Sequence, residues 1–248
     1  QWTAIDYTIT FDANGGTGGE VQTVAFGTTP TPPIVAKTGY TFAGWDPEII
    51  AVTGDTTYTA QWTVNSYSIT FDANGGTGGE VQTVAFGTTP TPPVVAKTGY
   101  TFAGWDPEVA AVTGDTTYTA QWTVNSYLIT FDANGGTGGE TQTFAYGVVP
   151  TPPSVTKPDY VFAGWSPAIQ AATENTTYTA QWIMLGDINF DGKINVLDAR
   201  LALQKASGLI TLTPTQLLAC DVNRDGKYNV VDARLILQYA SGLITHFG

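Results

Sequence analysis

The sequence predicts a multidomain protein, in which three small mainly β repeats precede an all-α region built from two loop–helix motifs. Three observations support this fold class. A Gln-Trp pair recurs every 60 residues, at 1–2, 61–62, 121–122 and 181–182. Within each unit, apolar and polar residues alternate with the period of two that is typical of a half-buried strand. After residue 186, two oxygen-rich segments offset by 34 residues each precede apolar residues at helical spacing.

The three copies are close in sequence, and their alignment predicts the domain boundaries. Residues 61–120 share 53 of 60 positions with 1–60 and 42 of 60 with 121–180. Because a Gln-Trp pair closes each unit, we expect residues 1–6 to be the end of a preceding repeat. The repeats themselves are expected at 7–62, 67–122 and 127–182, and the C-terminal domain at 183–248.

Each repeat is expected to contain four strands. In the first copy these are 7–11, 21–26, 40–45 and 56–62, separated by a Gly-rich stretch, a Pro-rich connection and an Asp-Pro turn. A module of about 56 residues buries only ~60% of its unfolded surface, so aromatic side chains should supply most of the core. The expected core aromatics of the first copy are Phe11, Tyr40, Phe42, Trp45, Tyr58 and Trp62.

The tryptophan that recurs in the third strand has a second interpretation. Trp45, Trp105 and Trp165 could form exposed platforms on which sugar rings stack, although a tryptophan that repeats once per small β unit is more often part of its core. Exposed, aligned rings would favour glycan binding, whereas buried rings would favour a spacer.

The two oxygen-rich segments, 187–198 and 221–232, have the spacing of calcium-binding loops. Both carry Asp or Asn at loop positions 1, 3, 5, 9 and 12 and Gly at position 6, where the chain must turn sharply between ligands. Position 7 contributes its backbone carbonyl. Two Ca²⁺ ions are therefore expected. The first set is Asp187, Asn189, Asp191, Lys193, Asn195 and Asp198, and the second is Asp221, Asn223, Asp225, Lys227, Asn229 and Asp232.

Helices are expected directly after the loops, at 196–207 and 230–241, with a short helix at 215–219 between the two halves. Gly208 and Gly242 follow the long helices, where a positive φ is common. Only four residues separate Trp182 from the first loop, so no helix enters it. Cys220 lies in an apolar stretch and is expected to be a small buried side chain.

Composition excludes several functions. The formal charge is −12, with nine basic and twenty-one acidic residues, which disfavours binding to nucleic acid. No apolar run is long enough to span a bilayer. One Cys and one His leave no disulfide framework and no His-based catalytic site, and no catalytic constellation is evident, so we expect no enzyme activity. Residues 183–248 hold six basic and six acidic residues, so the repeats carry all of the net charge.

The repeats resemble the Listeria–Bacteroides surface repeat family, also known from internalin B-type repeats. The motifs are Phe-Asp-Ala-Asn-Gly-Gly (11–16, 71–76, 131–136), Gly-Tyr-Thr-Phe-Ala-Gly-Trp (39–45, 99–105) and a closing Tyr-Thr-Ala-Gln-Trp. The third copy has Asp159-Tyr160-Val161 instead of Gly-Tyr-Thr. The resemblance implies a β-grasp-like fold, an extracellular setting and a role as a stalk or in adhesion.

Residues 187–248 resemble a type I dockerin, a calcium-dependent module that binds cohesin domains of cellulosome-like scaffolds. Comparison of 187–211 with 221–245 gives 19 identities in 25 positions, which predicts a nearly two-fold surface. The resemblance implies that the exposed positions of both helices contact the cohesin. These are Val196, Leu197, Arg200, Leu203 and Gln204 in the first half, and Val230, Val231, Arg234, Leu237 and Gln238 in the second. The alternative is that the apolar ones belong to the core.

Three functional interpretations follow. In the first, a secreted or cell-surface bacterial segment is fastened to a scaffoldin cohesin by its dockerin, and the repeats act as a spacer. In the second, the repeats bind glycans or a host surface and the dockerin is only an anchor. In the third, the chain is the C-terminal part of a polysaccharide-degrading enzyme. Because residues 183–186 are mostly apolar, we also expect the dockerin to pack against the third repeat, with Met184 and Phe247 contributing.

Overall fold

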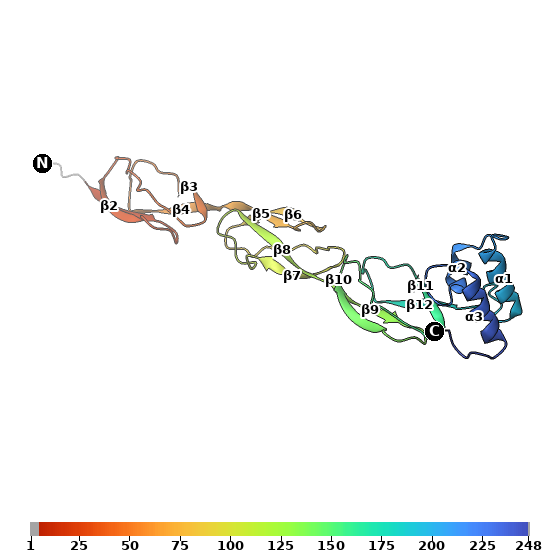
Figure 1. Ribbon diagram of the computed structural model, residues 1–248. Coiled ribbons are helices and arrows are strands. Elements are labelled where there is room, and N and C mark those ends of the chain that lie inside the picture. The colour runs from red at the N-terminus through yellow and green to blue at the C-terminus, as the bar shows by residue number, and fades with distance from the viewer. Residues whose placement is uncertain (1–4, 248) are drawn as a thin grey trace. The chain divides into compact units, whose positions relative to one another are not determined.

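The computed structural model describes residues 5–247 (Figure 1). The chain divides into two compact units, Gln1–Thr123 and Val124–Gly248. The first unit holds the first two repeats, and the second holds the third repeat together with the C-terminal helices. Of residues 1–6, which we expect to be the end of a preceding repeat, residues 1–4 lie outside the described residues, and Asp6 is the first residue of β1.

Each repeat folds as one four-stranded mixed sheet, which confirms the predicted mainly β architecture. The strands are β1 (Asp6–Asp12), β2 (Glu20–Ala25), β3 (Tyr40–Asp46), β4 (Thr56–Val64), β5 (Ser66–Asp72), β6 (Glu80–Ala85), β7 (Tyr100–Asp106), β8 (Thr116–Val124), β9 (Ser126–Asp132), β10 (Glu140–Ala145), β11 (Tyr160–Ser166) and β12 (Thr176–Met184). The first sheet has the order β2-β1-β4-β3, and the other two repeat it. The central pair, β1 and β4, is parallel, and both edge strands are antiparallel to their neighbours.

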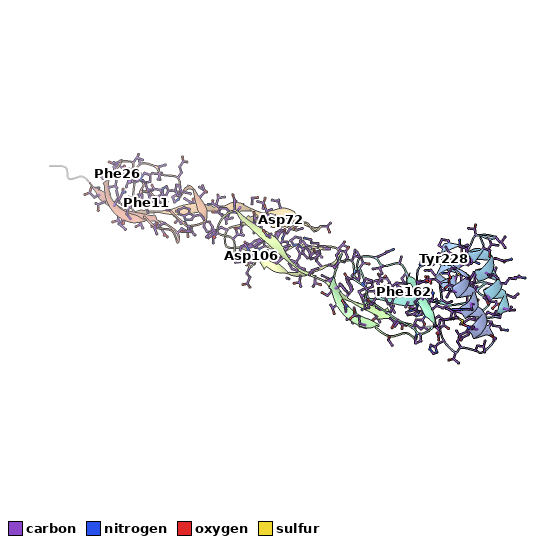
Figure 2. The ribbon with its side chains drawn as sticks, in the orientation of Figure 1. Phe11, Phe26, Asp72, Asp106, Phe162 and Tyr228 are labelled. Carbon is purple, nitrogen blue, oxygen red and sulfur yellow. The ribbon has the colours of Figure 1, made fainter. Side chains whose placement is uncertain are left out.

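The core of the first repeat lies on one face of this sheet. The alternation of β1 places Ile9 and Phe11 on that face, where they are 0% and 1% exposed, and Phe11 is labelled in Figure 2. Val52 and Tyr58 complete the fully buried set. The second and third repeats have equivalent cores. The alternating pattern therefore predicts the buried face of the strand correctly.

Three of the six expected core aromatics lie at the margin of the core. Phe42 is 39% exposed, and Tyr40 and Trp62 are half-buried. The reason is their place in the sheet, because Phe42 pairs with Trp62 and Tyr40 with Val64, beyond Thr59, where the pairing of β4 with β1 ends. A bulge in β3 between Phe42 and Gly44 brings Phe42 and Trp45 to the same side of the strand, with ring centroids 5.5 Å apart. The prediction that Tyr40, Phe42 and Trp62 supply the core was therefore wrong.

The Phe-Asp-Ala-Asn-Gly-Gly motif builds the turn after β1. Asn14 has a positive φ of 50°, and its side-chain amide donates to the Ala60 carbonyl at 2.9 Å. The Trp62 indole N–H donates to the Ala13 carbonyl at 3.0 Å. At Gly16, a β-carbon would lie 2.6 Å from the Ala36 carbonyl oxygen, so no larger residue fits without a shift. The motif residues therefore serve to build the turn within their own repeat.

The three C-terminal helices occur where they are expected. They are α1 (Val196–Ala206), α2 (Pro214–Cys220) and α3 (Val230–Ala240). Asn195 and Asn229 cap α1 and α3, and each capping box is closed by the Asp three residues further on. The long helices pack against each other, and Ile188, Val222 and Ile236 are fully buried in the core that the helices share. This arrangement confirms the predicted all-α region.

The third repeat is joined to this helical core without a free linker, as the apolar composition of residues 183–186 predicts. Leu185 follows β12 directly and is 2% exposed. Its amide donates to the Asp159 carbonyl at 2.9 Å, and the Gly186 amide donates to the Ala219 carbonyl at 2.8 Å. Phe247 is also buried and stacks on Tyr239 with centroids 4.9 Å apart. From the repeat, Ile183 and Val161 pack against this core, whereas Met184 is only half-buried.

Candidate calcium loops and helix groove

The first loop, 187–198, is closed by hydrogen bonds between its carboxylates and its own backbone. Asp187 accepts from the amides of Asp191 at 3.1 Å and Gly192 at 2.9 Å. At the other end, Asp198 accepts through Oδ1 from Ile188 at 2.9 Å, and through Oδ2 from the Asn195 amide at 3.0 Å. Asp198 is fully buried. The first and last predicted ligands therefore lie at the two ends of one compact loop.

The second loop, 221–232, repeats this arrangement with one difference. Asp221 accepts from the amides of Asp225 and Gly226 at 3.1 and 2.9 Å. Asp232 accepts from the Asn229 amide through Oδ2, but its Oδ1 is buried and has no hydrogen-bond partner among the described residues. A buried carboxylate oxygen without a partner is unfavourable unless a cation lies against it.

Two carboxylates of the loops have shifted pKa values. Burial raises the pKa of Asp232 above the usual aspartate value, and the nearby negative charge of Asp221 adds to the effect. The hydrogen bond from the Asn189 side chain lowers the pKa of Asp191, which is exposed. The raised pKa of Asp232 follows from burial, which disfavours the charged form of a carboxyl group.

The donor chemistry of both loops fits a hard divalent cation, since carboxylate, amide and backbone oxygens are the ligands that Ca²⁺ prefers. Within residues 5–247, however, no three Asp, Glu, His or Cys side chains gather closely enough to form a metal-binding group. Each set of predicted ligands lies in its own loop, and every Asp and Asn side chain of a set accepts at least one hydrogen bond from a backbone amide. It does not bring the three carboxylates of a loop to a common point.

A groove of about 560 Å³ runs between α1 and α3, and it joins the predicted recognition residues of both halves. Seven of the ten predicted positions line it: Val196, Leu197, Arg200, Leu203, Val230, Arg234 and Leu237. Val231, Gln204 and Gln238 do not. Ala199 and Ala233 also line the groove and were not predicted, although they stand three residues after Val196 and Val230, on the same helical face.

The valine and leucine side chains of the groove are exposed, so they are not simply core residues, whereas Ala199 and Ala233 are buried. Val196 and Val230 are 62% and 61% exposed, and Leu203 and Leu237 are each 48% exposed. The matching values reflect the internal repeat of the sequence. Arg200 and Arg234 are the charged residues of the lining. The groove is therefore an apolar surface flanked by positive charge, and it has the features of a protein-binding site.

The tryptophans of the third strand belong to the packed side of each repeat. Trp45 is half-buried, and its ring meets that of Phe11 edge-on at 4.9 Å. Trp105 and Trp165 make the same contact with Phe71 and Phe131. These rings are not free platforms, and the arrangement favours the spacer interpretation.

Cys220 is buried as predicted, with 1% of its surface exposed. Burial and the nearby carboxylates of Asp232 and Asp221 raise the pKa of its thiol to about 12. The thiol is thus protonated at neutral pH and packs as a small apolar group.

Comparison with known families agrees with the geometry. Residues 185–240 match the dockerin type I domain, and the Listeria-Bacteroides repeat domain matches at 7–66, 67–126 and 127–191. Both are non-catalytic domains, and a dockerin implies a cohesin partner. Type I dockerins generally bind calcium. No helix in the part of the chain that the structure describes is long and apolar enough to cross a membrane.

Three curated relatives were compared with the chain. A candidate membrane protein of Evansella cellulosilytica is 30% identical over 230 residues, which cover 77% of the chain and 34% of that protein. A candidate Gly-rich membrane protein of the same organism is 34% identical over 160 residues, covering 55% of the chain and 18% of that protein. Internalin H of Listeria monocytogenes is 36% identical over 118 residues, covering 40% of the chain and 20% of that protein.

The chain spans about a third or less of the length of these relatives. The repeat model nevertheless covers most of the chain, in three successive matches, and the dockerin model overlaps the last of them. The chain belongs to the Listeria-Bacteroides repeat family and carries a type I dockerin after its third repeat.

Proposed function

We propose that this chain is an extracellular attachment segment, in which the dockerin binds a cohesin of a cellulosome-like scaffold in a calcium-dependent manner. The observation that carries the proposal is the groove between α1 and α3. Val196 and Leu203 of the first half, and the equivalent Val230 and Leu237 of the second, are about half exposed in it. A surface of this kind is unfavourable in water, so a partner that covers it gains free energy from burial.

The charges of the groove indicate the chemistry of the partner. Arg200 and Arg234 flank the apolar strip, and the groove lining contains no acidic residue. A complementary cohesin surface would present apolar side chains at its centre and carboxylates at its rim, where they pair with these arginines. Such rim charges mainly increase the association rate and the specificity of binding.

The loops prepare this surface, because the last ligand of each loop also caps a groove helix. Asp198 closes the capping box of α1 with Asn195, and Asp232 does the same for α3 with Asn229. The predicted ligands of each loop would hold Ca²⁺, which would supply positive charge to their carboxylates. Asp198 and Asp232 therefore hold the N-termini of the helices, where Val196 and Val230 stand.

The repeats are proposed to act as a spacer. In the first unit, β4 ends at Val64 and β5 begins at Ser66, so one residue separates two sheets. The Asn65 amide donates to the Gly39 carbonyl at 2.9 Å, and the Phe86 amide donates to the Asn65 carbonyl at 2.8 Å. Consecutive repeats joined in this way keep a defined distance better than a flexible linker of the same length.

A second function is proposed for the repeats because they are similar to part of Internalin H and match the Listeria-Bacteroides repeat domain. On this proposal, the repeats contact a glycan or a host surface and the dockerin anchors them. The tryptophan packing described above favours the spacer. Membership of a larger polysaccharide-degrading enzyme is a further proposal, which concerns the whole protein.

The test is binding of the full chain to immobilised cohesins, compared with a variant that carries Val196→Asp and Val230→Asp. Loss of one buried anchor from an interface costs about 2 kcal/mol, or roughly 30-fold in affinity, so the variant, which lacks one anchor in each half, should bind its cohesin at least about 30-fold more weakly than the native chain. Ile34→Asp is the matched control, since Ile34 is 95% exposed and lies in the first repeat. Unchanged binding of the groove variant would exclude the groove as the interface.

A further inference from the structure

The three repeats provide an internal comparison at the edge where each one ends. At four aligned positions the first two repeats are identical and the third differs. The residues are Gly39, Gly99 and Asp159; Thr41, Thr101 and Val161; Thr63, Thr123 and Ile183; and Asn65, Asn125 and Leu185. Three of the four changes replace a polar side chain by a large apolar one. They concern the end of the repeat that precedes the dockerin.

In the first repeat, this edge forms a polar joint. The Thr41 hydroxyl donates to the Asn65 side chain at 2.6 Å, and the Asn65 amide donates to the Gly39 carbonyl at 2.9 Å. The Phe86 ring of the second repeat lies over Gly39, where a β-carbon would meet ring atoms at 2.1 Å. The end of the first repeat is therefore shaped to contact a following repeat.

In the third repeat, the same edge belongs to the dockerin core. Leu185 is 2% exposed within that core, and Val161 and Ile183 pack against it. The backbone bond is kept, since the Leu185 amide donates to the Asp159 carbonyl at 2.9 Å. Asp159 has a positive φ of 59° and borders a cavity of about 330 Å³, which Leu185 and Phe247 also line.

The dockerin is adapted to the repeat as well. Its two halves are nearly identical, but position 4 of the loop is Phe190 in the first half and Arg224 in the second. Phe190 is 49% exposed, whereas the Arg224 guanidinium donates to the Tyr160 carbonyl in β11 at 3.0 Å. The Gly186 amide also donates to the Ala219 carbonyl in α2. Both sides of the boundary therefore differ from their internal copies in ways that join them.

We infer that the third repeat and the dockerin form one cooperative folding unit, in which β11 and β12 supply part of the hydrophobic core of the dockerin. The third repeat is then a stabilising partner of the dockerin, and the edge formed by Val161, Ile183 and Leu185 is its docking surface. This inference goes beyond cohesin binding and does not depend on it. The unit that stays folded is the third repeat with the dockerin, and residues 185–240 alone lack part of their core.

The test is hydrogen exchange of the full chain carrying Val161→Thr and Ile183→Thr. These substitutions restore the residues of the first two repeats, whose sheets form with threonine at both positions, so the third sheet should tolerate them. In calcium, the amides of α2 and α3 should exchange about tenfold faster or more than in the native chain, because helices lose protection when their core contacts are removed. The control is Thr41→Val with Thr63→Ile in the first repeat, which should leave the dockerin helices unchanged.

A second measurement uses the native chain and is independent of any variant. Chelation by EDTA should increase exchange at the β11–β12 pair of the third repeat, while the equivalent pair β3–β4 of the first repeat keeps its protection. Native protection of α2 and α3 in the threonine variant would overturn the inference. The inference would also be overturned if, in EDTA, the dockerin helices exchanged freely while β11 and β12 stayed as protected as β3 and β4.

Discussion

The ring of Phe86 in the second repeat covers the α-carbon of Gly39 in the first. A β-carbon at residue 39 would lie 2.1 Å from ring atoms Cδ1 and Cγ, and Gly39 also has a positive φ of 78°. The Phe86 ring also lies near the Tyr40 ring of the first repeat, with ring centroids 6.3 Å apart. Glycine is thus required at this joint for two reasons, backbone conformation and space.

Gly39→Ala should open the joint between the first two repeats. Strain at positive φ costs about 1–2 kcal/mol, and overpacking against Phe86 costs about 1–3 kcal/mol more. Gly27→Ala is the matched control, because Gly27 has a φ of 76° with open space around its β-carbon position. Chemical unfolding of both variants separates the two effects. Equal losses for the two substitutions would show that Phe86 contributes nothing.

Much of this fold can be predicted from local sequence patterns. The period of two along β1 correctly indicates that Ile9 and Phe11 face the core, and the helical spacing of apolar residues after each loop correctly predicts α1 and α3. The exposure of Phe42 and the bulge that follows it were not predicted, and Phe42 pairs with Trp62 beyond the part of β4 that pairs with β1. Backbone geometry of this kind depends on the partner strand, which the local pattern does not contain.

The candidate site also has features that the local sequence predicts and features that depend on tertiary packing. Donor spacing in the loops is a local property, and it identifies the predicted ligands. The groove is not local, because Ala199 and Ala233 become its lining only when α1 packs against α3. Likewise, the contact between Arg224 and the Tyr160 carbonyl joins residues 64 positions apart.

Asp232→Asn should remove one calcium ion from the dockerin and leave the other. Asp232 is the twelfth residue of the second loop, and its buried Oδ1 has no partner among the described residues. An amide there loses the negative charge that a hard cation requires. Titration calorimetry should give two sites for the native chain and one for the variant. Glu108→Gln, an exposed change in the second repeat, is the control and should keep two sites.

Cys220 offers a probe of dockerin opening. Its side chain is 1% exposed in the helical core, so a thiol reagent reaches it only after that core opens. Alkylation of the native chain should be slow in calcium and fast after EDTA is added, because the loops that hold α1 and α3 are then released. Mass spectrometry at a constant pH gives both rates. Equally fast alkylation in calcium and in EDTA would contradict the burial of this side chain in solution.

The near identity of the two dockerin halves predicts two ways of binding the same cohesin, related by about 180°. Val196→Asp with Leu197→Asp disables the first half, and Val230→Asp with Val231→Asp disables the second. Each pair alone should leave affinity within about threefold of the native value, because the other half presents equivalent residues. All four changes together should abolish binding. Loss of binding with a single pair would establish one orientation.

The central claim is that this chain attaches to a cohesin through a calcium-dependent dockerin, and the most direct test is calorimetric titration of the native full chain with a panel of cohesins. In calcium, at least one cohesin should bind with a stoichiometry of one. After treatment with EDTA the same cohesin should show no binding heat, and added calcium should restore it. Binding that is equally tight in calcium and in EDTA, or no binding to any cohesin in calcium, would contradict the claim.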